Sequence, residues 1–112
     1  MARQRASAMV SSQASAQVVQ FVRTIMSQIR PDGYTQAARM LAGADLADDL
    51  RALRCPIRVA SGDADTITPP AGCRAVAQVA GAPWLSLGEV GHACVAEAPE
   101  RVINLLQVCN DR

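Results

Sequence analysis

One histidine and two aspartates are the residues of this sequence best suited to acid–base chemistry. His92 is the only histidine among 112 residues, and Asp63 and Asp65 precede it in the chain. A carboxylate that accepts a hydrogen bond from one imidazole nitrogen fixes the tautomer of the ring and stabilises the imidazolium form. The other ring nitrogen is then free to act as a general base. These residues could therefore form an acid–histidine pair, if the fold brings their loops together.

The sequence patterns on either side of the aspartates and the histidine indicate that their two loops lie side by side. Residues 56–60 and 84–87 have the pattern of short buried strands, and they end shortly before the aspartates and the histidine. A helix is predicted between them over residues 70–80, with two prolines at its start, where a missing N–H has no cost. A last helix is predicted over residues 99–108. The strand, crossover helix and second strand form a βαβ unit, whose parallel strands lie about 4.8 Å apart and present functional groups at their carboxyl ends.

The first 53 residues have helical periodicity instead. One helix is predicted over residues 12–29, with Ser11 or Ser12 as its cap, and a second over residues 34–41. A third is expected with Asp45 as its cap. The first helix carries a wide apolar stripe, which must cover another part of the protein. The stripe consists of Val18, Val22, Ile25 and Ile29.

Two loops resemble those of a known family, the α/β-hydrolases. Residues 62–70, with the sequence Gly-Asp-Ala-Asp-Thr-Ile-Thr-Pro-Pro, are similar to the loop that supplies the acid of the catalytic triad. In that family the acid stands three residues after the glycine and four before the first proline, which is Asp65 here. Residues 91–93, Gly-His-Ala, followed by Glu-Ala-Pro-Glu at 97–100, resemble the histidine loop and the start of the last helix. The resemblance covers residues 54–107.

The resemblance implies an α/β protein with a partial α/β-hydrolase fold. Residues 1–53 would be a remnant of the helical cap, and residues 54–112 a β-α-β-α unit from the edge of a larger parallel sheet. The segment from residue 31 to residue 50 resembles the cap-to-core join of enol-lactonase-like and small-ester hydrolases. The family's G-x-S-x-G nucleophile elbow does not occur in the sequence. We therefore expect the chain to be the C-terminal part of such a protein, without the half that bears the nucleophile.

The activity implied by the resemblance is hydrolysis of a carboxylic ester or lactone by an acyl-serine route. His92 would be the base and then the acid, and Asp65 would orient it. No metal or organic cofactor is implied. Relatives of this fold also hydrolyse C–C bonds, dehalogenate or make peracids, and these loops do not separate those reactions. The chain alone lacks a nucleophile and is expected to be inactive, so a non-catalytic remnant, a binding module or one half of a split enzyme are the alternatives.

Several neighbouring residues have simpler structural interpretations. Asp63 is expected to bind loop N–H groups, as aspartate often does in turns. Glu97 and Glu100 are expected to favour the N-terminus of the last helix through its dipole. Cys94 stands two residues from His92 and could form a Cys–His nucleophile pair, although a buried small residue is the favoured interpretation. Trp84 is expected to pack in the core.

Charge and hydropathy limit the classes of partner. The eleven basic residues, all arginines, nearly balance ten acidic ones, and the net charge of +1 argues against nucleic acid or an anionic membrane as the main partner. No run of 18 apolar residues and no signal-peptide pattern occurs, so a cytoplasmic protein is expected. The strand at residues 56–60 should be interior to the parent sheet, and an open edge invites pairing with another chain. We therefore expect self-association or pairing with the missing half.

The four cysteines do not indicate a disulfide framework or a zinc site. They are widely spaced and form no C-x-x-C pair. Reduced and mostly buried thiols are expected at the four positions, which are Cys55, Cys73, Cys94 and Cys109.

Overall fold

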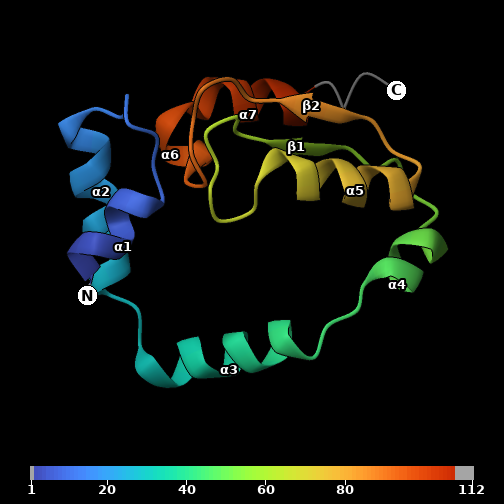
Figure 1. Ribbon diagram of the computed structural model, residues 1–112, viewed down its shortest axis with the longest axis horizontal. Coiled ribbons are helices and arrows are strands. Elements are labelled where there is room, and N and C mark those ends of the chain that lie inside the picture. The colour runs from blue at the N-terminus through green and yellow to red at the C-terminus, as the bar shows by residue number, and fades with distance from the viewer. Residues whose placement is uncertain (1, 108–112) are drawn as a thin grey trace.

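The computed structural model describes residues 2–107, which form short helices and a small two-stranded parallel sheet (Figure 1). Four helices come first, followed by a strand, a helix, a second strand and two further helices. In chain order they are α1 (Ala2–Ala8), α2 (Ala16–Ser27), α3 (Pro31–Ala42), α4 (Ala47–Ala52), β1 (Val59–Ser61), α5 (Pro70–Ala80), β2 (Trp84–Ser86), α6 (Cys94–Glu97) and α7 (Pro99–Gln107).

The predicted βαβ unit is present. Strands β1 and β2 pair in parallel, with Val59 opposite Trp84 and Ser61 opposite Ser86, and α5 connects them. Helix α5 has the predicted bounds and ends at Gly81, which adopts the left-handed conformation (φ 60°) that glycine tolerates best. Both strands are shorter than predicted: β1 begins three residues later and ends one residue later than the predicted 56–60, and β2 ends one residue before residue 87. The first ladder bond of β1 runs from the N–H of Val59 to the carbonyl of Pro83.

The boundaries of the N-terminal helices differ from the prediction. Ser15, not Ser11 or Ser12, caps α2, because its hydroxyl accepts a hydrogen bond from the N–H of Val18 at 3.2 Å. Helix α3 begins at Pro31 rather than residue 34, since proline at the first helical position is already set for helix. Helix α4 begins at Ala47, and its N-cap is Leu46, which makes no side-chain cap hydrogen bond, so the predicted cap at Asp45 is wrong. The Asp45 carboxylate does accept from the N–H of Ala47 at 3.3 Å. Helices α1 and α6 were not predicted.

At the C-terminal end, α7 begins at Pro99 as predicted and extends to Gln107. The final residue of the predicted helix, residue 108, lies outside the described residues.

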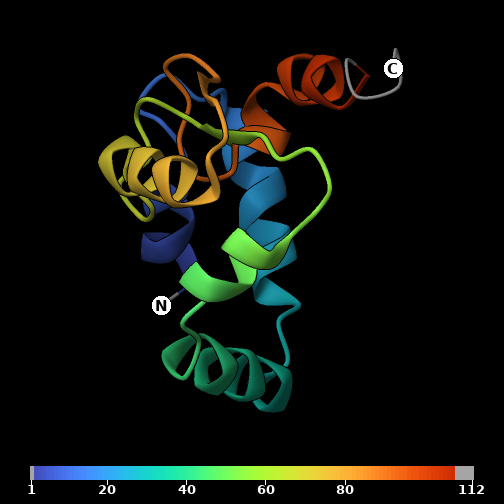
Figure 2. The same ribbon diagram turned by 90° about the vertical axis from the view of Figure 1, so that its right-hand side faces the viewer.

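The arrangement is open. Helix α3 stands apart from the strands in both views (Figure 1 and Figure 2), and none of its residues is buried. Arg5 of α1 reaches it, with a 3.2 Å hydrogen bond from its guanidinium to the hydroxyl of Tyr34. The radius of gyration is 15.4 Å, whereas about 13 Å is typical of a compact domain of this length. The accessible surface is 8252 Å², against about 5,900 Å² for a compact monomer of this mass.

Much of the excess surface is apolar. Val22 is the buried residue of α2, while Phe21, Ile25 and Ile29 remain 58%, 50% and 47% exposed. The predicted apolar stripe is therefore only partly covered by the described residues. Among those residues, no helix is both long enough and apolar enough to cross a membrane.

Candidate functional site

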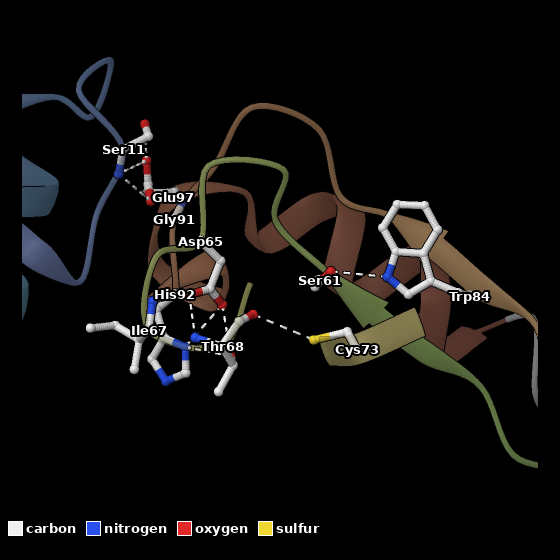
Figure 3. A network of polar contacts seen from close by, with 10 residues as sticks. All are labelled: Ser11, Ser61, Asp65, Ile67, Thr68, Cys73, Trp84, Gly91, His92 and Glu97. Atoms are coloured by element: carbon white, nitrogen blue, oxygen red, sulfur yellow. Dashed lines mark hydrogen bonds and ion pairs between the residues drawn. The ribbon is translucent and has the colours of Figure 1, made fainter. Parts of the chain in front are cut away.

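The acid loop, residues 62–70, follows β1, and hydrogen-bond donors surround the carboxylate of Asp65 in it. Its Oδ1 accepts hydrogen bonds from the backbone N–H groups of Ile67 and Thr68, both at 2.9 Å. Its Oδ2 accepts from the hydroxyl of Thr68 at 2.9 Å and lies 3.0 Å from Nδ1 of His92 (Figure 3). Only 6% of Asp65 is exposed. A buried carboxylate with this many donors has its orientation set by the loop itself.

Backbone contacts bring the acid loop and the histidine loop together. The N–H of Asp63 donates to the carbonyl of Gly88 at 2.8 Å, and that of Ala64 donates to the carbonyl of Val90 at 3.1 Å. A Cβ atom on Gly62 would overlap the same Val90 carbonyl, so the close approach requires glycine there. The sequence prediction that these loops lie side by side is confirmed.

His92 completes a three-membered cluster. Its Nδ1 lies 3.0 Å from the Asp65 carboxylate and 3.1 Å from the hydroxyl of Thr68. That hydroxyl has one proton, which it donates to Asp65, so it can only accept from the ring. Both partners of Nδ1 are therefore acceptors, which assigns the ring proton to Nδ1 and leaves a lone pair on Nε2.

The second ring nitrogen of His92, Nε2, is accessible to a proton donor. Nε2 points away from Asp65 and from Thr68 (Figure 3), and the side chain of His92 is 32% exposed. The predicted Asp65–His92 distance, within hydrogen-bond range, is found. An imidazole held by a carboxylate at one nitrogen, with the other nitrogen open, can accept a proton and return it.

The electrostatics of Asp65 favour its charged form. Burial by itself raises the pKa of this carboxyl, but the hydrogen bonds from Thr68, His92 and Ile67 outweigh burial and leave the pKa below its ordinary value. The group is thus a carboxylate at neutral pH. A negative charge beside Nδ1 stabilises the imidazolium that forms when Nε2 takes a proton.

Two neighbouring carboxylates do not act as the sequence suggested. Asp63 accepts from the hydroxyl of Ser86 at 2.7 Å instead of from loop N–H groups, because Asp65 already binds those groups. Glu97 was expected to act on the last helix through its dipole. Its carboxylate instead accepts from the N–H of Gly91 at 2.7 Å and from the backbone and hydroxyl of Ser11. It lies at the end of α6 and turns toward the N-terminal segment.

Sequence reasoning missed two supporting residues for different reasons. Thr68 stands three residues after Asp65, and short-range bonds of this kind between a carboxylate and a following hydroxyl could have suggested its role. Ser11 is 86 residues from Glu97. No local pattern in the sequence could have indicated that contact.

Cys94 is poorly suited to be the nucleophile. Its thiol is half-buried, and burial raises its pKa, so it is protonated at neutral pH. It is a free cysteine, as are Cys55 and Cys73, while Cys109 lies outside the described residues. The expected burial is wrong for the three described cysteines, since Cys55 is exposed and the other two are half-buried. Within residues 2–107, no group of three or more His, Cys, Asp or Glu side chains is placed to hold a metal ion.

Trp84 of β2 contacts the neighbouring strand β1 and helix α5. Its indole N–H donates to the hydroxyl of Ser61 at 3.0 Å, and the guanidinium of Arg74 lies 4.3 Å from the ring centroid. The ring is half-buried between the strand and α5 instead of being fully enclosed in the core. Arginine stacked on indole is a favourable cation–π arrangement.

The comparisons with known proteins gave one structural likeness. No family model matches the sequence, and the search of curated proteins found no match. Among solved structures, the fold is similar to that of a thermophilic esterase from Thermogutta terrifontis, solved with malate bound, with a TM-score of 0.85 and 27% sequence identity. The match covers 96% of this chain and 41% of the esterase. The chain thus spans about two fifths of the length of that protein.

Proposed function

We propose that this chain is the C-terminal part of a serine-type α/β-hydrolase that acts on a carboxylic ester or lactone. The observation that carries the proposal is the 3.0 Å contact between Nδ1 of His92 and the buried carboxylate of Asp65. It lies at the carboxyl ends of two parallel strands, where folds of this class place their functional groups. The esterase neighbour supports ester hydrolysis as the type of activity.

In the proposed mechanism His92 transfers the protons and Asp65 keeps the ring in place. Nε2 removes the proton of a serine hydroxyl as the serine oxygen attacks the ester carbonyl, and the Asp65 carboxylate stabilises the resulting imidazolium. The imidazolium then gives the proton to the departing alkoxide, which leaves an acyl-serine. Water then takes the place of the alcohol: His92 removes a proton from water as the water oxygen bonds to the acyl carbon. The bond between the acyl carbon and the serine oxygen breaks, the imidazolium returns the proton to the serine oxygen, and the carboxylic acid is released.

We infer that the serine comes from a segment outside these 112 residues. Three serines near the site already have other partners, and one of them, Ser11, donates its hydroxyl to Glu97. Ser61 is buried and its hydroxyl accepts from the indole of Trp84, whereas the hydroxyl of Ser86 donates to Asp63. Neither stands in the strand-to-helix turn that a nucleophile elbow requires. C–C bond hydrolysis, dehalogenation and perhydrolysis would use the same pair, and the acyl pocket would decide between them.

The open surface supports the same conclusion. Within the described residues β1 pairs only with β2, and in this register the N–H and C=O of Ala60 point away from β2. A further strand of the same sheet can therefore pair there. The accessible surface exceeds that of a compact monomer by about 2,300 Å², comparable to the area buried in a large permanent interface. We infer that residues 1–53 serve as cap and residues 54–112 as core of a larger sheet.

A chimera tests the proposal. The matched two fifths of the esterase are replaced by this chain, so that the remaining part of that protein supplies what this chain lacks. We expect turnover of an activated ester that is lost in the His92→Ala variant and kept in Cys94→Ala. The isolated chain should hydrolyse the same ester no faster than free imidazole. A chimera that is folded and monomeric but inactive would contradict the proposal and favour a non-catalytic binding module.

A further inference from the structure

We propose that Glu97 is a positioning residue, whose carboxylate fastens residues 9–11 to the histidine loop and so sets the place of His92. The catalytic meaning of this clamp rests on the proposed function, but the contacts that define it do not. The clamp consists of Glu97, of the segment 9–11 between α1 and α2, and of the loop residues on either side of the histidine.

Both oxygens of the Glu97 carboxylate are used. Oε2 accepts from the N–H of Gly91 at 2.7 Å and from the N–H of Ser11 at 3.0 Å. Oε1 accepts from the same Ser11 N–H at 3.1 Å and from the Ser11 hydroxyl at 2.5 Å. Figure 3 shows Ser11, Glu97 and Gly91 together on one side of the cluster. Hydrogen bonds to an ionised acceptor are about twice as strong as neutral ones, and Ser11 is buried.

The same segment also holds the residue that follows the histidine. The N–H of Ala93 donates to the carbonyl of Met9 at 2.7 Å. A Cβ on Gly91 would lie 2.6 Å from the carbonyl carbon of Val10, so the two backbones touch directly. The N–H groups immediately before and after His92 are thus held by residues 9–11, one directly and one through Glu97.

This arrangement couples the histidine to the N-terminal helices. Asp65 and Thr68 orient the imidazole ring, but they do not bind the backbone N–H groups of the residues before and after His92. Segment 9–11 holds those groups and leads directly into α2, which also packs on α6. A displacement of α1 and α2 therefore moves the backbone on both sides of His92. Proton transfer tolerates little misplacement, so the docking of these helices sets whether Nε2 is in position.

The contacts explain why a carboxylate is required. Every group that faces Glu97 in these contacts is a donor. A glutamine amide has nearly the same shape but offers one acceptor oxygen, and its NH2 group would oppose an N–H of Gly91 or Ser11. The Glu97→Gln substitution therefore tests the chemistry of the clamp with little change of volume. Glu100→Gln is the matched control, because Glu100 is exposed in the first turn of α7 and loses the same charge.

The experiment is nuclear magnetic resonance of the 15N-labelled 112-residue chain. In the Glu97→Gln variant we expect hydrogen-exchange protection of the Gly91 and Ser11 amides to fall by about tenfold or more, since bonds to charged groups are lost. The ring nitrogens of His92 should change from one Nδ1–H tautomer to an exchanging mixture. Glu100→Gln should match the parent chain in both readouts, and far-ultraviolet circular dichroism should show equal helix content in all three.

Several outcomes would overturn the clamp. One is a parent chain in which the Gly91 and Ser11 amides are unprotected. Another is a His92 ring that keeps its single tautomer in Glu97→Gln although Gly91 protection is lost, which would make Glu97 a structural residue only. Should Glu97→Gln fail to fold, Ser11→Ala removes the hydroxyl contact to Glu97 and keeps the bonds from the backbone N–H of Ser11, although it also removes the 3.3 Å bond from the N–H of Gln13 to the hydroxyl. It should lower Gly91 protection by a smaller factor, and unchanged protection would refute the proposal.

None of these measurements uses hydrolysis. An inactive chimera with an intact clamp would therefore count against the proposed function alone, and an active chimera without the clamp would count against this inference alone.

Discussion

Replacement of Asp65 by asparagine should reverse the tautomer of His92. The amide must turn its oxygen toward the two backbone N–H groups that now bind Oδ1, because its NH2 group would oppose them. The NH2 group then takes the place of Oδ2, facing the hydroxyl of Thr68 and Nδ1 of His92. A donor at that position forces Nδ1 to accept, so the ring proton moves to Nε2. The nitrogen that should act as the base is then blocked.

The effect on turnover should be far larger than the effect on stability. A wrong tautomer removes both the general base and the stabilisation of the imidazolium, which in the serine protease triad amounts to about 10⁴-fold in rate, or about 5.4 kcal/mol of activation free energy. The folded state exchanges charge-assisted bonds of a buried group for neutral ones, with a loss of about 1–3 kcal/mol in the free energy of unfolding. The Asp65→Asn variant should therefore stay folded while it loses activity.

Two measurements check this reasoning. The 15N shifts of the His92 ring in the 112-residue chain should show the proton on Nδ1 in the parent and on Nε2 in Asp65→Asn. Ester turnover by the chimera should fall about 10⁴-fold in the same variant. Activity within tenfold of the parent, or an Nδ1–H ring in the variant, would refute the assignment of Asp65 as the orienting acid. Asp63→Asn is the control, because Asp63 binds Ser86 and should leave the His92 tautomer unchanged.

Three further outcomes are expected. Hydrogen bonds hold the pKa of Asp65 below its ordinary value of 3.8 despite burial. The stabilising contribution of its carboxylate is therefore present above pH 3.8 and is lost as the pH falls through the lowered pKa. Urea midpoints of the parent and of Asp65→Asn should differ at neutral pH and converge in strong acid. Gly62→Ala should push the Val90 carbonyl away and lower the free energy of unfolding by about 1–3 kcal/mol. The control Gly72→Ala, which has open space around it in α5, should be neutral or stabilising. Equal urea midpoints for the two variants would contradict the close approach of Gly62 to Val90. The isolated chain should self-associate at micromolar concentration in sedimentation experiments, because of the free side of β1 and its exposed apolar surface; a compact monomer with one cooperative thermal transition would show that it is self-sufficient.

Local sequence patterns were enough to predict the helix and the two strands around the acid–histidine pair. Residues 70–80 have prolines at one end and a glycine at the other, and α5 has the same bounds. Two short apolar runs on either side of a helix predict parallel strands, and such strands bring the loops at their carboxyl ends together. That topology predicts that the loop of Asp63 and Asp65 meets the loop of His92, because each loop directly follows its strand. The choice of Asp65 as the partner of His92 came from the resemblance of residues 62–70 to the acid loop of the α/β-hydrolases.

The tertiary structure alone decided which groups surround the pair. Asp63 and Asp65 have similar local surroundings in the sequence, and only the position of Ser86 on the neighbouring strand gives Asp63 a separate partner. The contact of Glu97 with Ser11 closes a loop of 86 residues, and no periodicity or motif spans that distance. The start of α3 at Pro31 and the cap of α2 at Ser15 each lie about one helical turn from the predicted position. Sequence patterns report on neighbours within a few residues, whereas hydrogen-bond partners far apart in the chain are chosen by which groups the packed backbone brings within reach.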